Sequence, residues 1–147
     1  MAVQTLTDTL AELPTQLRLG VMRLARRLRQ ETSGQITLSM HSALSVLDRH
    51  GPLTLGELAG LERVAPPSMT RIASRLEDAG LVVRRVDAAD RRVARLTVSP
   101  EGRRLLKEIR GRRDAYLAQR LGSFTPEERA ALAEALPLLE RLSGDVP

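Results

Sequence analysis

Polar and basic side chains that suit contacts with a polyanion gather in two short segments of the chain. The first segment contains Pro67, Ser68, Thr70, Arg71 and Arg75, and the second is Asp90, Arg91 and Arg92. An arginine guanidinium forms paired hydrogen bonds with the edge of a guanine base, and hydroxyl groups bond to base edges or phosphates. These residue types therefore suggest recognition of nucleic acid.

Catalytic chemistry has little support in the sequence. The chain contains no cysteine, and its only histidines are His41 and His50, whose separation of nine residues does not place them on one helical face. No local Ser-His-Asp pattern and no transition-metal ligand spacing is present. We therefore expect no enzyme, no cofactor and no metal site, and we interpret His41 as an ordinary packing or surface residue.

The charge balance points to a polyanionic partner. The formal net charge is +5, and the segment from Arg63 to Arg95 contains eight arginines and four acidic residues, a local net charge of +4. All basic residues except Lys107 are arginines, so the presence of an arginine does not by itself indicate a contact with the partner. Its position in the fold has to indicate that contact. Tyr116 and Phe124 are the only aromatic residues, which argues against stacking of single-stranded bases and leaves duplex DNA.

The start of the chain does not resemble a signal peptide. Residues 1–5 contain no basic segment that an apolar stretch follows, and no apolar run approaches the ~18 residues of a membrane span. The absence of cysteine suits a reducing compartment. These features predict a cytoplasmic protein without a membrane span.

Apolar periodicity predicts helices at both ends of the chain. One stripe, on one long helix or on two pieces broken near Pro14, contains Leu6, Leu10, Leu13, Leu17, Val21, Leu24 and Leu28. Ser99-Pro100 begins a later helix with Leu105, Leu106, Ile109, Tyr116, Leu117 and Leu121. Thr125 to Glu128 caps a last helix, kinked at Pro137, with Leu132, Leu136, Leu139 and Leu142.

The middle of the chain predicts three short helices and a hairpin. The first helix starts at about Ser39, and Thr54 with Glu57 has the spacing of a capping box for the second. Pro66-Pro67 suits the first turn of the third helix, which Gly80 closes. Residues 81–86 and 93–98 are rich in β-branched residues and flank a polar tip, the pattern of a β-hairpin.

This order of elements is that of a winged helix-turn-helix. We predict a mainly α-helical single domain over residues 1–147 with a small β-hairpin wing, in which residues 36–99 form the DNA-binding part. Residues 6–31 and 100–144 are predicted to be N- and C-terminal dimerisation helices. Such apolar stripes require a covering surface, because large exposed apolar patches are uncommon on monomers.

The third short helix is the predicted recognition helix. Its expected inward stripe is Met69, Ile72, Ala73, Leu76 and Ala79. The opposite face then carries Ser68, Arg71, Arg75 and Asp78, and the N-terminal end is the part that reaches base edges in the major groove. The alternative interpretation is a solvated polar face, since exposed arginine is common.

The same residues resemble the MarR family in order and spacing. The resemblance is carried by Leu53–Ala59, Pro67–Arg71, Arg75–Val82, Asp90–Arg92 and Leu96–Gly102, and it is specific from about Leu38 to Leu106. It implies a triangular homodimer whose first, fifth and sixth helices interlock. It also implies a recognition helix in the major groove and a wing in the flanking minor groove.

The resemblance also assigns roles within the wing. Arg92 is expected to enter the minor groove, where a narrow A·T-rich groove attracts a guanidinium, and Asp90 is expected to orient it. We expect Arg84, Arg85 and Arg95 to contact phosphates or water rather than bases. The alternative for Asp90 and Arg91 is a solvated surface turn.

The implied function is that of a sequence-specific, double-stranded-DNA-binding transcriptional regulator. The resemblance implies a repressor that binds a pseudo-palindromic operator and is released by a small aromatic or phenolic ligand bound between the dimerisation and DNA-binding parts. Two alternatives stay open. The basic and apolar stretch from Leu17 to Arg29 also fits a membrane-surface helix, and a winged helix can serve as a protein-interaction module.

Overall fold

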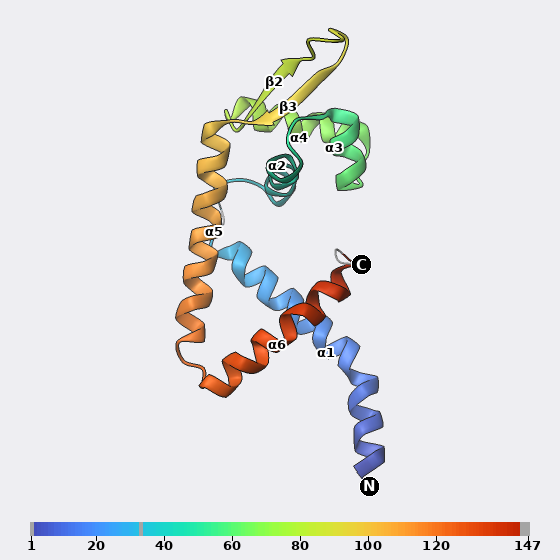
Figure 1. Cartoon of the computed structure of the whole chain (residues 1–147), viewed down its shortest axis with the longest axis vertical. Coiled ribbons are helices and arrows are strands. Elements are labelled where there is room, and N and C mark those ends of the chain that lie inside the picture. Colours follow the sequence, from blue (N-terminus) through green and yellow to red (C-terminus); the bar gives the residue numbers. More distant parts are fainter. Residues whose placement is uncertain (1, 33, 145–147) are drawn as a thin grey trace.

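The chain forms a helical frame that supports a small winged lobe (Figure 1). The structure is a computed structural model that describes residues 2–32 and 34–144, with side chains described from residue 9 onward. Its elements are α1 (Ala2–Gln30), α2 (Leu38–His50), β1 (Leu53–Thr54), α3 (Leu55–Glu62), α4 (Pro66–Asp78), β2 (Val82–Val86), β3 (Ala94–Val98), α5 (Pro100–Leu121) and α6 (Pro126–Ser143). The predicted fold class is confirmed.

The wing is part of a three-stranded antiparallel sheet with the strand order β1-β3-β2. Val82 pairs with Val98 at the base of the wing, and Leu53 of β1 pairs with Leu96 on the other side of β3. The sequence predicted the hairpin but not β1, because two residues are too few to display the alternation that identifies a strand. This short strand attaches the start of α3 to the wing.

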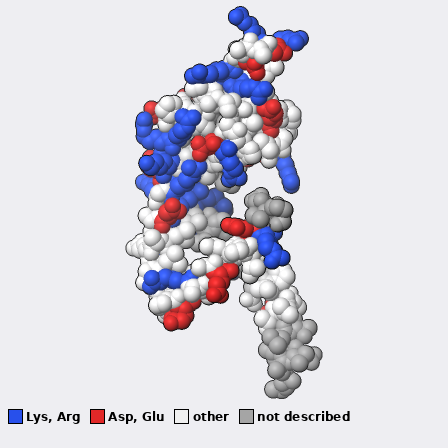
Figure 2. Space-filling model, in the orientation of Figure 1, with Lys and Arg blue, Asp and Glu red and all other residues white. Residues whose placement is uncertain are grey.

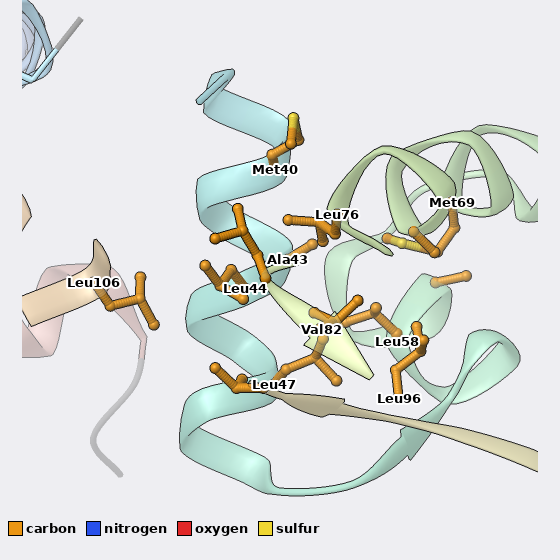
Figure 3. Packing of buried hydrophobic residues seen from close by; sticks show 14 residues of the cluster. Met40, Ala43, Leu44, Leu47, Leu58, Met69, Leu76, Val82, Leu96 and Leu106 are labelled. Atoms are coloured by element: carbon orange, nitrogen blue, oxygen red, sulfur yellow. The ribbon is translucent and has the colours of Figure 1, made fainter. Parts of the chain in front are cut away.

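The core of the winged lobe is aliphatic and centred on α2 (Figure 3). The predicted stripe of α2 is buried, and Leu44 and Leu47 belong to one cluster with Leu58 of α3, Leu76 of α4 and Leu96 of β3. On α4, Met69, Ala73 and Leu76 have no exposed surface, and Ile72 is partly buried. The prediction for Ala79 is wrong, since it forms the C-cap of α4 and is exposed.

Capping hydrogen bonds define where the helices begin. In the capping box of α3, the Glu57 carboxylate accepts the Thr54 backbone N–H at 2.8 Å, and the Thr54 hydroxyl accepts the Glu57 N–H at 3.1 Å. The same reciprocal pair starts α6, as predicted. The α2 helix begins at Leu38 rather than Ser39, because the hydroxyl of Thr37 accepts the backbone N–H of Met40.

Helices α1 and α6 cross below the winged lobe and leave most of their apolar side chains exposed in the single chain (Figure 1). The α1 helix continues through Pro14, so it is one long helix, and α6 is assigned as one continuous helix through Pro137. The side chain of Leu6, which belongs to the predicted stripe, lies outside the described residues. No residue of α6 is buried.

The sole tyrosine connects α1 to α5. The Tyr116 hydroxyl accepts a hydrogen bond from Arg27 Nε at 3.3 Å. Two guanidinium carbons also lie close to its ring, at 5.0 Å (Arg27) and 5.4 Å (Arg120) from the ring centroid. Cation–π contacts of this kind favour a fixed arrangement of the three side chains. They therefore hold the end of α1 against the lower half of α5.

We predict that Gly102→Ala destabilises the fold by about 1–3 kcal/mol, the usual effect of overpacking. A Cβ at this position would collide with the carbonyl oxygen of Leu81 and lie 2.9 Å from Val98 Cγ1. The matched control is Gly111→Ala in the same helix, whose Cβ meets no atom within 4 Å and which should stabilise the protein by about 0.5–1 kcal/mol. Urea unfolding measures both changes, and equal midpoints for the two variants would contradict the prediction.

Candidate nucleic-acid interface

The α4 helix presents its polar face because its apolar face is fixed in the core. The turn before it contains Arg63, whose φ of 53° places it in the left-handed region, and this residue ends α3. Pro66 and Pro67 occupy the first turn of α4, where a missing N–H leaves no helical hydrogen bond unmade. Burial of Met69, Ala73 and Leu76 then directs Arg71 and Arg75 outward.

Arg71 and Arg75 lie one helical turn apart beside a shallow hollow of about 350 Å³. The hollow is lined by Ser68, Arg71, Ile72 and Arg75 of α4 and by Thr37, Ser39 and Met40 near the start of α2. Within the described part of the chain, no carboxylate forms an ion pair with either arginine. Both guanidiniums can therefore contact a ligand without first breaking an internal ion pair.

The other predicted residues of α4 differ in their surroundings. Ser68 is half-buried and lines the same hollow, whereas Pro67 is exposed on the first turn. The Thr70 hydroxyl donates a hydrogen bond to the Pro66 carbonyl oxygen at 3.0 Å, so its proton is already used while its lone pairs remain free to accept. The structure thus groups Ser68, Arg71 and Arg75 and leaves Thr70 outside the hollow.

In the wing, Asp90 holds Arg92 through both carboxylate oxygens. Arg92 Nε donates to Oδ1 at 3.1 Å and Nη2 donates to Oδ2 at 3.2 Å, while the Arg92 backbone N–H donates to Oδ1 at 3.1 Å. The Arg92 side chain is 91% exposed, so the carboxylate orients a guanidinium that solvent surrounds. These hydrogen bonds, the side-chain ones first, lower the pKa of Asp90. Arg91 is exposed at the same tip.

Two arginines at the base of the wing have protein partners that the sequence did not predict. Arg84 forms an ion pair of 2.6 Å with Glu77 near the end of α4. Arg95 lies 3.3 Å from Glu57 and 3.3 Å from Asp87. Both guanidiniums therefore contact protein carboxylates, while more than a third of each side chain stays exposed to solvent. Their partners lie 7 to 38 residues away, a separation at which local sequence patterns carry no signal.

Asp87 stabilises the turn that begins the wing tip. Its carboxylate accepts the Ala89 backbone N–H at 2.8 Å, and its own N–H donates to the Val93 carbonyl oxygen at 2.8 Å. The Ala89 hydrogen bond is the main cause that lowers the pKa of Asp87, and Arg95 adds to it. Sequence reasoning did not identify Asp87, although an Asp two residues before a turn amide is the usual signal for such a bond.

Positive charge concentrates on the winged lobe. Figure 2 shows Lys and Arg side chains gathered at the wing tip, over the lobe and along the upper part of α5, whereas acidic side chains are mixed with basic ones over α6 on this face. An extended surface of one sign raises the local concentration of an oppositely charged partner. On this face, the charge distribution therefore favours a polyanion contact at the lobe that contains α4 and the wing.

A second hollow, of about 210 Å³, lies where α1, α2 and α5 meet. Its lining includes Arg29, Thr32, Ile36, His41 and Arg113. Arg113 Nη2 donates to the Thr32 hydroxyl at 3.2 Å, while Arg113 Nε is buried without a hydrogen-bond partner. His41 is half-buried, and burial, followed by the charges of Arg113 and Arg110, lowers its pKa. Two arginines and a histidine therefore line this hollow.

Metal and membrane chemistry receive no support from the described residues. Among residues 2–32 and 34–144, no group of three or more acidic, histidine or cysteine side chains is placed to hold a metal ion. In the same part of the chain, no helix combines the length and the apolar character that a membrane crossing requires.

Known proteins resemble both the sequence and the fold. The model of the MarR family matches residues 36–94. An HTH-type transcriptional regulator of Mycobacterium bovis is 41% identical over 95% of this chain and 99% of its own length. A MarR family protein from Bacillus stearothermophilus has a TM-score of 0.80 and 32% identity over 94% of this chain and 97% of its own. The structure of a transcriptional regulator from Pseudomonas aeruginosa has a TM-score of 0.83 and 36% identity over 90% of this chain and 94% of its own.

We predict that Arg92→Ala raises the pKa of Asp90 toward its ordinary value, because the main hydrogen bonds to the carboxylate are lost. The pKa of Asp90 in the folded protein is lowered, so the ion pair between Asp90 and Arg92 is fully formed above the ordinary pKa of an aspartate. The ion pair is lost as the pH falls through the pKa of Asp90 in the folded protein. A carboxyl-carbon NMR titration measures the change. Arg91→Ala is the matched control and should leave the Asp90 pKa in place; an equal rise in both variants would refute the specific pairing.

Proposed function

Because this chain belongs to the MarR family of DNA-binding transcriptional regulators, we propose that it recognises a pseudo-palindromic operator as a homodimer, with α4 in the major groove and the wing in the minor groove. The observation that carries the proposal is the pair of exposed arginines, Arg71 and Arg75, which no described carboxylate neutralises, on the helix whose inner face is buried. An arginine that is free of internal ion pairs can form paired hydrogen bonds with guanine.

The wing supplies the second part of the proposed interface. Asp90 orients Arg92 without shielding it from solvent, so the guanidinium can enter a groove with little loss of side-chain freedom. Narrow A·T-rich minor grooves have the strongest negative potential. We therefore propose that Arg92 reads groove width next to each half-site, that Arg91 contacts the flanking backbone, and that Pro67, Ser68 and Thr70 line the approach to base edges.

The homodimer is supported by the exposed apolar faces of α1 and α6. A hollow of about 670 Å³ between them is lined by Leu13, Pro14, Leu17, Arg18, Val21, Leu139, Leu142 and Ser143. A contiguous apolar surface of this kind is uncommon on a monomer, and burial against the same helices of a second copy removes it from water. A two-fold dimer then favours pseudo-palindromic DNA with half-site centres about one helical turn apart.

We further propose that the protein represses transcription in the cytoplasm and that a small anionic aromatic or phenolic ligand releases it from DNA. The hollow between α1, α2 and α5 supports this regulation, because Arg29, His41 and Arg113 line a space between the dimerisation helices and the winged lobe. A ligand in this hollow would bind one placement of the winged lobe relative to the dimerisation helices better than another. Such a difference in ligand affinity is what a change in DNA affinity requires.

Selection of bound sequences from a random pool of duplex DNA tests the proposed function. Enrichment of a two-fold-symmetric motif would support it, because one result reports binding, symmetry and half-site spacing. Absence of any DNA affinity at low salt would favour the alternative of a protein-interaction module. Flotation of the protein with anionic liposomes, together with absence of sequence enrichment, would favour the membrane-surface alternative.

We predict that Arg71→Ala reduces affinity for the selected operator more than affinity for random duplex DNA. Loss of a paired base contact removes about 1–3 kcal/mol of discrimination, whereas loss of a phosphate contact weakens binding to all sequences alike. Fluorescence anisotropy at fixed salt measures both affinities. If operator and random DNA lose the same factor, Arg71 is a backbone contact and its assignment as a base-reading residue is wrong.

We predict that Leu136→Asp on α6 shifts the protein from dimer to monomer at micromolar concentration. The new carboxylate would have to be buried in the proposed apolar interface, where an unpaired charge is strongly unfavourable. Leu61→Asp on α3 is the matched control, because Leu61 is similarly exposed (50% against 57% for Leu136) but lies outside α1 and α6. Light scattering coupled to size-exclusion chromatography measures the mass, and a monomeric wild type would contradict the dimer.

A further inference from the structure

Arg95 connects two elements that meet DNA in different grooves under the proposed function. From β3, its Nη1 lies 3.3 Å from Glu57 Oε2 on α3, and its Nε lies 3.3 Å from Asp87 Oδ2 at the start of the wing tip. The side chain is 37% exposed, so solvent screens these ion pairs only in part. One guanidinium thus joins the helix-turn-helix to the wing.

The two carboxylates that bind Arg95 are themselves attached to the backbone. Glu57 Oε2 also accepts the Thr54 N–H at 2.8 Å in the capping box of α3. Asp87 Oδ1 accepts the Ala89 N–H of the wing turn at 2.8 Å. Because a guanidinium is planar and its donors have a fixed geometry, binding at both sides limits the angle between these two backbone segments.

We propose that Arg95 is a positioning residue that holds the wing at a set angle to α3 and α4, so that Arg92 reaches the minor groove while Arg71 occupies the major groove. The inference rests on the proposed DNA-binding mode. It assigns Arg95 no contact with DNA, since two carboxylates already neutralise its charge. Arg95 acts instead through the placement of Arg92.

Arg85 provides a matched control within the same hairpin. It pairs directly with Arg95 in the register of β2 and β3, and it is exposed. Among the described side chains, it has no ion-pair partner. Removal of either arginine changes the net charge equally, so a difference between the two variants cannot come from the charge alone.

The experiment measures the affinities of wild type, Arg95→Ala and Arg85→Ala for the selected operator with A·T-rich or G·C-rich flanks across a salt series. Arg85→Ala should lose the same factor on both flanks, as a phosphate contact would. Arg95→Ala should lose on the order of tenfold more on A·T-rich flanks, and this extra loss should disappear when Arg92→Ala is already present. Arg95→Lys should restore part of the flank preference, because an ammonium can pair with one carboxylate at a time.

Glu57→Gln separates positioning from electrostatics. A glutamine retains the capping hydrogen bond to Thr54, so α3 keeps its start, while the ion pair to Arg95 is lost. Removal of a negative charge near DNA should tighten a purely electrostatic interaction. The proposal requires the opposite sign: weaker binding to the operator with A·T-rich flanks. Tighter binding by Glu57→Gln, or an equal loss for Arg95→Ala and Arg85→Ala on both flanks, would overturn it.

Hydrogen exchange of the free protein tests the link through Arg95 without DNA. Failure of the link can therefore be distinguished from failure of the proposed function. The Asp87 and Val93 amides donate hydrogen bonds within the wing turn, so Arg95→Ala should speed their exchange, and Arg85→Ala should not. If wild type lacks sequence preference while Arg95→Ala speeds exchange, the proposed function fails and the mechanical link stands. If exchange is unchanged in Arg95→Ala, the link itself is refuted. Light scattering and thermal unfolding confirm that each variant is folded and has the wild-type mass.

Discussion

Complete burial of one face of α4 is the constraint on which the arrangement of the winged lobe depends. Met69, Ala73 and Leu76 have no exposed surface, and they pack against α2, α3 and the sheet. A helix held along one face cannot rotate about its axis without opening cavities in a core that is close-packed. The outward direction of Arg71 and Arg75 is therefore a consequence of packing three aliphatic side chains, and the polar residues do not have to enforce it themselves.

Local signals in the sequence were enough to predict this lobe. The apolar stripe of α2, the two capping boxes and the Ser99-Pro100 start of α5 all lie where expected, because each signal involves residues within one or two helical turns. Arg71, Arg75, Asp90 and Arg92 were singled out for the same reason, and the structure exposes the three arginines and pairs Arg92 with Asp90. The strand β1, the exposure of Ala79 and the partners of Arg84 and Arg95 were missed, since they depend on which elements become neighbours after folding.

The helices at the two ends of the chain show what the spacing of apolar residues does not predict. The spacing of apolar residues predicts α1 and α6 as well as it predicts α2. The apolar stripe of α2 is buried, however, while α6 has no buried residue. The same apolar pattern thus specifies that a face needs covering but not which molecule covers it. Among the described residues, the crossing of α1 and α6 and the contacts of Arg27 and Arg120 with Tyr116 organise this region.

The length of α5 has a mechanical consequence. It runs unbroken from the base of the wing to the turn before α6, and its 22 residues extend about 33 Å at ~1.5 Å per residue. A rigid rod of that length converts a tilt of about 10° at its lower end into a displacement of roughly 6 Å at the winged lobe, almost two base-pair steps of ~3.4 Å. A small tilt at the lower end is therefore large enough to move the lobe out of register with a DNA groove.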